Sequence, residues 1–273
     1  MTDRETSFPS LDGTGLRGTV TGAQGERRGV AVLVHGAGVT RREGGFFDRL
    51  AAGLAAVDIE TLRFDLRAHG ESEGKPEEIT IAGVANDIRA AADHIRETGG
   101  TRLPVHVIAA SFSGGAAALH AGSHPQEVGS LVLLNPRLDY RERYLSSRPY
   151  VRDGYLDPGA VHDLNNQGFT ERSPFALGRA LLNECQHLDP EDYLGRVVAP
   201  TLIVHGTKDT FVQVDSTRRY RSAFGGPVTV HELDGSEHGF AVHNDPGYAH
   251  PQSQAWQAEV IDRVANFLVA WPQ

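Results

Sequence analysis

Short apolar runs alternate along the chain with longer segments whose apolar residues recur at helical spacing. The segment 80–97 shows the helical pattern well, because Ile81, Val84 and Ile88 fall on one face and Gly99 ends the run. The strand pattern is equally plain at 59–64. The periodicity therefore predicts a regular alternation of strands and helices.

This alternation predicts a fold class and the place of a site. The predicted strands are 16–21, 30–35, 59–64, 104–109, 130–134, 201–205 and 228–233, and the predicted helices are 46–56, 80–97, 112–123, 216–224 and 254–269. Strands that alternate with helices form a doubly wound, mainly parallel α/β sheet. Binding sites of such sheets lie at the carboxyl ends of the strands.

One long segment interrupts the alternation. The pattern predicts no strand between Pro136 and Pro200, and only an apolar helix near 175–182. An insertion of this length is usually functional. We therefore expect a core of residues 1–136 and 200–273 with a cap or lid, residues 137–199, over the site. A structural layer that never touches substrate is the alternative.

Composition and charge exclude several classes of partner. The chain has 273 residues, of which 40% are hydrophobic and 22% charged, as in an ordinary globular protein. The net charge of −9 argues against nucleic acid or an anionic membrane as a partner. The sequence shows no secretory signal and no apolar stretch of membrane-spanning length. Its single cysteine, Cys185, fits a cytoplasmic location and makes a zinc site unexpected.

The stretch 105–115 reads as a nucleophile elbow, a sharp turn from strand to helix that exposes one hydroxyl. Such a turn needs small residues two before and two after the nucleophile. Ser111 meets this requirement with Ala109 and Ser113, and it is the predicted nucleophile. Ser113 is the rival, but it would lengthen the strand by polar or bulky residues and shorten the helix. A simple serine N-cap of a buried helix also accounts for the local pattern.

A nucleophilic serine needs a base, and the base needs an orienting acid. Asp209 and His238 follow Ser111 in the chain order that the elbow fold requires, each in a loop after a strand. Taken singly, Asp209 could be a turn aspartate and His238 an exposed loop histidine. His243 is the nearest rival base, and Asp215 is a rival acid that looks more like a helix cap.

Two backbone N–H groups must stabilise the oxyanion. The residue after the nucleophile, Phe112, supplies one, and Ala37 in the flexible turn after the strand 30–35 supplies the other. His35 and His69 are interpreted as structural residues near this turn. A glycine-rich turn after a strand can also hold phosphate. However, no nucleotide-binding motif is present.

At this point the chain resembles an α/β-hydrolase fold protein of the esterase and serine-aminopeptidase-like group. The matching stretches are His35-Gly36-Ala37-Gly38, Arg63-Phe64-Asp65-Leu66-Arg67-Ala68-His69-Gly70-Glu71-Ser72, Ser111-Phe112-Ser113-Gly114-Gly115, Pro200-Thr201-Leu202-Ile203-Val204-His205-Gly206-Thr207-Lys208-Asp209 and Glu237-His238-Gly239-Phe240. The resemblance implies an eight-stranded sheet. Its usual distance from the elbow serine to a His-Pro pair, here His124-Pro125, selects Ser111. The cap is similar to those of bacterial cinnamoyl- or feruloyl-esterase-like members.

The resulting expectation is a serine esterase that forms an acyl-enzyme and needs no cofactor or metal. A thioesterase or acyltransferase on the same triad is the alternative, and a non-catalytic ligand-binding protein is the alternative from another class. Tyr140, Tyr144 and Phe169 in the cap are candidate substrate contacts, although they could simply pack the cap on the core. The expected partner is a small ester or thioester, and a homodimer is left open.

Overall fold

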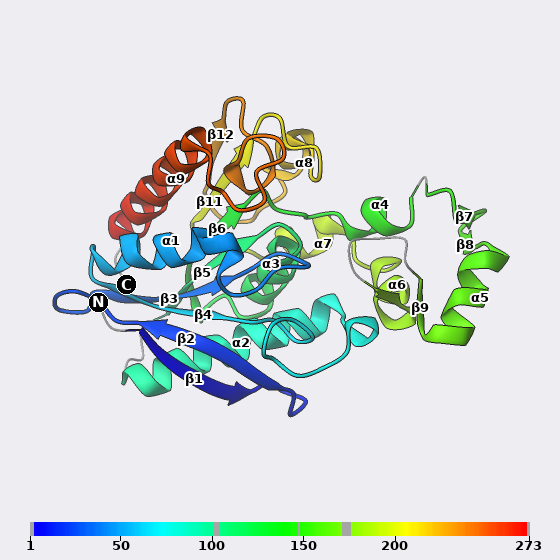
Figure 1. Cartoon of the computed structure of the whole chain (residues 1–273), viewed down its shortest axis with the longest axis horizontal. Helices are drawn as coiled ribbons and strands as arrows, with labels where there is room; N and C mark the ends of the chain where they lie inside the picture. Colours follow the sequence, from blue (N-terminus) through cyan, green and yellow to red (C-terminus); the bar gives the residue numbers. More distant parts are fainter. Residues whose placement is uncertain (1–2, 101–103, 147, 171–175, 272–273) are drawn as a thin grey trace.

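The computed structural model describes residues 3–100, 104–146, 148–170 and 176–271. A sheet of eight strands runs through the protein in the order β1-β2-β4-β3-β5-β6-β11-β12 (Figure 1). Its strands are β1 (Asp3–Pro9), β2 (Gly15–Thr21), β3 (Gly29–Val34), β4 (Ile59–Phe64), β5 (Val105–Ala110), β6 (Val128–Leu134), β11 (Thr201–Gly206) and β12 (Val228–Leu233). The doubly wound α/β fold predicted from the alternation is confirmed.

The sheet is parallel from β4 to β12, and β2 pairs antiparallel with both β1 and β4. Hydrophobic patterning missed β1 because only one of its seven residues, Phe8, is buried. The central strands β3 and β5 are buried along their whole length. The carboxyl ends of the parallel strands therefore lie at one edge of a buried core.

Helices cover both faces of the sheet. They are α1 (Phe46–Ala55), α2 (Ile81–Gly99), α3 (Ser113–Ser123), α8 (Val214–Tyr220) and α9 (Pro251–Ala270). Side chains of α1 and α9 share one apolar cluster with Leu33 and Ile108 of the sheet. Side chains of α2, α3 and α8 share the cluster on the other face with Val32 and Val107. Successive side chains of each strand thus pack against helices on opposite faces of the sheet. No helix of the described residues is both long and apolar enough to cross a membrane.

The described residues between 137 and 199, called the inserted segment below, extend mostly to one side of the sheet (Figure 1). The segment contains α4 (Tyr140–Tyr144), β7 (Val151–Arg152), β8 (Tyr155–Leu156), α5 (Pro158–Gln167), β9 (Phe169–Thr170), β10 (Leu177–Gly178), α6 (Arg179–Cys185) and α7 (Pro190–Leu194). The expectation that it contains no strand is wrong, because β7 pairs with β8 and β9 with β10. Ladders of two residues are too short to produce an alternating pattern. The start of the helix predicted near 175–182 lies outside the described residues.

A half-buried carboxylate fastens the inserted segment to the core. Glu184 on α6 accepts hydrogen bonds from the N–H groups of Ile81 at 2.5 Å and Ala82 at 2.8 Å. These are the first residues of α2, where backbone N–H groups lack partners within the helix. Burial raises the pKa of Glu184. The contact joins two elements about one hundred residues apart, and no local pattern could have predicted it.

Candidate active site

Ser111 lies in the two-residue turn between β5 and α3, with a backbone φ of 51°. This left-handed conformation is uncommon for a residue with a side chain, and it is the strained geometry of a nucleophile elbow. The turn is crowded, because a Cβ added to Gly36 would lie 3.1 Å from the Ser111 Cβ. Hydrogen bonds of 2.9 Å from Ser111 N–H to the Leu134 carbonyl and from Arg137 N–H to the Ser111 carbonyl hold the turn.

Ser113, the rival nucleophile, is completely buried. Its hydroxyl donates a hydrogen bond of 2.6 Å to the carbonyl of His35. Ala109 is also completely buried, so the two positions that flank Ser111 are both filled by small side chains under the turn. The Ser113 side chain therefore links the start of α3 to the loop after β3.

His238 lies after β12 and reaches both other members of the predicted triad. Its Nε2 is 2.9 Å from the Ser111 Oγ, and its Nδ1 is 2.6 Å from the Asp209 Oδ2. The ring is partly exposed, whereas the Asp209 side chain is completely buried. Three residues separated by long stretches of sequence thus form one continuous hydrogen-bonded chain.

Asp209 is held in place on both carboxylate oxygens. Its Oδ1 accepts hydrogen bonds from the N–H groups of Phe211 at 2.8 Å and Val212 at 2.9 Å. Burial acts to raise the pKa of Asp209, but the nearby His205 ring, the bond to His238 and the Val212 N–H outweigh it and hold the pKa below its usual range. The carboxylate therefore stays ionised beside the His238 ring.

The rival base and the rival acid from the sequence analysis, His243 and Asp215, pair with residues outside the triad. His243 is exposed, and its Nδ1 is 3.0 Å from the Glu237 Oε2. Asp215 pairs with Arg218 at 2.8 Å. The interpretation of Asp215 as a helix cap is wrong, because Gln213 is the N-cap residue and Asp215 lies within the first turn of α8.

In the loop after β3, two backbone N–H groups donate hydrogen bonds to side chains, and the N–H group between them does not. Gly36 N–H donates to the Glu43 Oε2 and Gly38 N–H donates to the His69 Nε2, each at 3.1 Å. Between them, the Ala37 N–H has no acceptor among the described residues. His35 supports the loop from beneath, where its Nε2 accepts the Leu66 N–H at 3.0 Å and burial lowers the pKa of the ring to about 4. Phe112 is the N-cap residue of α3, directly after Ser111.

The three candidate substrate contacts differ in position. Tyr140 is buried, with its hydroxyl donating to the Phe112 carbonyl at 2.5 Å and accepting from the Ala116 N–H at 2.9 Å. Tyr144 is also buried, and Phe169 is half-buried in β9. These positions fit the packing interpretation for the two tyrosines. Contact of any of the three with substrate stays a prediction.

Sequence reasoning missed three residues beside the triad: Glu43, Arg137 and Phe211. Glu43 is buried, has a φ of 46°, and lines a cavity of about 10 Å³ together with Ser111 and His238. Burial raises its pKa. Phe211 is 64% exposed, and its ring centroid is 5.3 Å from that of His238. An acid at the start of a short 3-10 helix and an aromatic residue after Asp209 carry no distinctive sequence signal.

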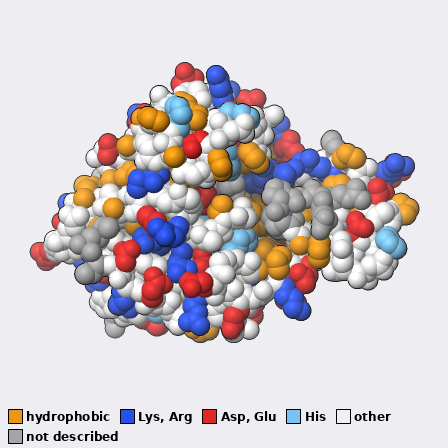
Figure 2. Space-filling model, in the orientation of Figure 1, with side chains coloured by type: hydrophobic (Ala, Val, Ile, Leu, Met, Phe, Trp, Pro, Cys, Tyr) orange, Lys and Arg blue, Asp and Glu red, His pale blue; other side chains and the backbone are white. Residues whose placement is uncertain are grey.

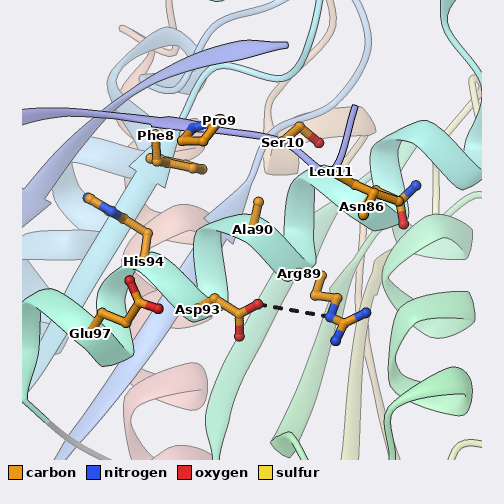
Figure 3. A pocket seen from close by; sticks show the side chains of 10 residues that line it. All are labelled: Phe8, Pro9, Ser10, Leu11, Asn86, Arg89, Ala90, Asp93, His94 and Glu97. Carbon is orange, nitrogen blue, oxygen red and sulfur yellow. Dashed lines mark ion pairs between the residues drawn. The ribbon is translucent and has the colours of Figure 1, made fainter. Parts of the chain in front are cut away.

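A second cavity, of about 410 Å³, lies between β1 and α2 (Figure 3). The Phe8 ring stacks on His94 there, and an ion pair joins Arg89 to Asp93 at 3.9 Å. The cavity contains no residue of the triad. Its one hydroxyl nucleophile, Ser10, donates to the Asp87 Oδ1 at 2.6 Å.

Among the described residues, no group of His, Cys, Asp and Glu side chains is arranged to hold a metal ion.

Comparison with known proteins places this chain in a family. The sequence model of the Alpha/beta hydrolase family matches residues 31–250, which include all three residues of the hydrogen-bonded chain. The chain belongs to the alpha/beta hydrolase family. A monoacylglycerol lipase of Mycolicibacterium smegmatis is 26% identical over 243 residues, which cover 80% of this chain and 83% of the lipase.

Two solved structures of this fold illustrate the similarity. The ferulic acid-bound Est1E from Butyrivibrio proteoclasticus is 20% identical and superposes with a TM-score of 0.73, covering 95% of this chain and all of Est1E. DcsB in complex with its substrate analogue is 17% identical, with a TM-score of 0.72, and covers 99% of this chain and all of DcsB. At these identities the structures support the fold alone.

Proposed function

We propose that this alpha/beta hydrolase is a serine esterase that cleaves a carboxylic ester through an acyl-enzyme. The observation that carries the proposal is the chain from Ser111 Oγ to His238 Nε2 to Asp209 Oδ2, with separations of 2.9 and 2.6 Å. The relative named as a monoacylglycerol lipase supports ester chemistry.

The geometry suits a general-base mechanism. The Ser111 Oγ attacks the ester carbonyl carbon while His238 Nε2 takes the hydroxyl proton. The N–H groups of Ala37 and Phe112 stabilise the oxyanion. When the tetrahedral intermediate collapses, the C–O bond to the alcohol breaks and His238 returns the proton to the departing oxygen.

The second half of the reaction uses the same residues. His238 takes a proton from water, and the resulting hydroxide attacks the acyl carbonyl carbon. Collapse of this intermediate breaks the bond to the Ser111 Oγ, which regains a proton from His238, and the carboxylic acid leaves. The ionised Asp209 keeps the His238 Nδ1 protonated throughout and stabilises the imidazolium. In this proposal the inserted segment acts as the cap.

Intact-mass spectrometry tests the proposal directly. The wild-type protein, mixed rapidly with a panel of 4-nitrophenyl esters, is expected to gain the mass of the acyl group and to release nitrophenol. The Ser111→Ala variant is expected to do neither and to resist labelling by a fluorophosphonate. Labelling that persists in Ser111→Ala, or an ester panel that is bound without any acyl-enzyme, would contradict the proposal.

A further inference from the structure

A pocket rich in arginine lies beside the loop that follows Asp209, and one of its lining residues, Arg137, is bonded to the Ser111 turn. Arg137 N–H donates to the Ser111 carbonyl, and Gly115 N–H donates to the Arg137 carbonyl, both at 2.9 Å. The backbone of Arg137 is therefore fixed to both sides of the elbow turn. Its guanidinium Nη2 donates to the carbonyl of Phe211 at 2.6 Å, which places the cation next to the loop that holds Asp209.

The pocket has a volume of about 360 Å³, and four arginines line it together with Phe211: Arg137, Arg143, Arg148 and Arg219. It lies where the inserted segment meets the sheet, and Figure 2 shows basic side chains gathered at that junction, on the side of the core that faces the inserted segment. Such a group of cations is unexpected in a chain with a net charge of −9. A local reversal of charge in a cleft concentrates anions there.

The acids that line the same pocket are already engaged. Glu142 pairs with Arg219 at 3.4 Å. Asp215 pairs with Arg218, which does not line the pocket. Asp139 accepts a hydrogen bond of 2.7 Å from the Tyr220 hydroxyl and caps α4.

Three of the arginines lack an acidic partner. Among the described residues, no carboxylate lies within 4.0 Å of Arg137, Arg143 or Arg148. The Nε of Arg148 is buried without a hydrogen-bond acceptor in that same part of the chain. The half-buried position of Arg137 lowers the pKa of its guanidinium. Partly desolvated cations without counter-charges are costly, so such a site favours an anion.

We propose that this pocket binds an anionic group of the substrate, a carboxylate or a phosphate, while the ester carbonyl lies at Ser111. The inference rests on the proposed function and names its substrate class: esters or thioesters with a negative charge on the acyl or the leaving group. The guanidinium groups of Arg143 and Arg148 pair with the anion. Arg137, already bonded to Phe211, contributes its charge at the inner end of the pocket.

Two substrate pairs distinguish the source of the anion. Mono-4-nitrophenyl suberate against 4-nitrophenyl octanoate tests a carboxylate on the acyl group, and octanoyl-CoA against octanoyl-pantetheine tests phosphates on the leaving group. The wild-type protein is expected to prefer the charged member of one pair. The ratio of kcat/KM for charged and neutral members should fall about tenfold in Arg143→Gln or Arg148→Gln, the loss of one charge-assisted bond. Arg152→Gln, an exposed arginine of β7 outside the pocket, is the matched control and should leave the ratio unchanged.

A wild-type ratio near one in both pairs, or equal ratios in all variants, would overturn the inference while ester hydrolysis itself stands. If no ester is hydrolysed, the proposed function fails, and titration calorimetry with suberate and with inorganic phosphate tests the pocket alone. Binding to the wild-type protein that disappears in the Arg143→Gln/Arg148→Gln double variant supports the anion site. Absence of binding, or binding that survives the double variant, overturns it.

Discussion

The Ser113 hydroxyl donates a hydrogen bond of 2.6 Å to the carbonyl of His35. This bond ties the start of α3, and with it the Ser111 turn, to the loop that presents the Ala37 N–H. The turn of the nucleophile and the loop of the proposed oxyanion donor are therefore joined by a direct hydrogen bond. Preorganised donors of this kind need no rearrangement when charge develops.

Replacing Ser113 by Ala tests this role against that of Ser111. Ser113→Ala is expected to keep fluorophosphonate labelling, because its hydroxyl is buried, and to lose about 1 kcal/mol of unfolding free energy with the bond. Labelling kinetics and urea denaturation measure the two effects. Loss of labelling in Ser113→Ala, with retention in Ser111→Ala, would exchange the roles of the two serines.

Asp209→Asn should lower kcat by roughly 10³–10⁴-fold with little change in thermal stability. The amide cannot both keep the two backbone N–H bonds to its oxygen and accept the His238 Nδ1–H, so the ring loses its orientation. Steady-state hydrolysis of a 4-nitrophenyl ester measures the effect. Asp215→Asn tests the rival acid, and a decrease of equal size there would reassign the role.

Glu43 is expected to position the Gly36 N–H through its own carboxylate oxygen. Glu43→Gln keeps an acceptor and should retain most activity, whereas Glu43→Ala should lose about tenfold in kcat, less than loss of an oxyanion donor itself. Equal kcat values in the two variants would contradict this role.

The same residue makes stability depend on pH. Burial raises the pKa of Glu43 in the folded protein above its value in the unfolded chain. The contribution of Glu43 to the free energy of unfolding is therefore fully present below the unfolded-chain pKa. It is lost as the pH rises through the folded-state pKa. The Tm difference between Glu43→Gln and the wild-type protein should therefore grow in favour of the variant from pH 4.5 to pH 8. Thermal melts across that range measure it.

His120 should make the protein sensitive to acid. Both ring nitrogens lack hydrogen-bond partners in the described residues, and burial lowers the pKa of the ring to about 3. The unfolded chain binds a proton below about pH 6.5 while the folded protein does not, so stability falls by about 2 kcal/mol between pH 6.5 and 4.5. His120→Leu should flatten this dependence, and His187→Leu, at an exposed position, should not.

Glu184→Ala should loosen the inserted segment and destabilise the protein by about 1–2 kcal/mol, because it removes the acceptors of two N–H groups at the start of α2. Limited proteolysis and thermal melts measure the two effects. Asn183→Ala, an exposed position of the same helix, is the control. Unchanged proteolysis in Glu184→Ala would show that other contacts hold the segment.

The sequence by itself determined the main sheet, apart from β1, and the three residues that meet at its carboxyl edge. Each of these features has a local cause: continuous apolar runs form buried strands, and small residues around Ser111 permit the turn from β5 into α3. The order of Ser111, Asp209 and His238 then follows from strands that end at the same edge.

Only the tertiary structure decided what surrounds those residues. The Tyr140 hydroxyl bonds to the backbone of α3, Glu184 binds α2, and Arg137 joins the elbow to the Phe211 loop. Each contact links segments that are distant in sequence. The sequence pattern around a single tyrosine, glutamate or arginine does not indicate whether its side chain faces solvent or packs against another segment. Packing the inserted segment against the core is what gives these residues their partners, because burial removes the water that would otherwise solvate their polar groups.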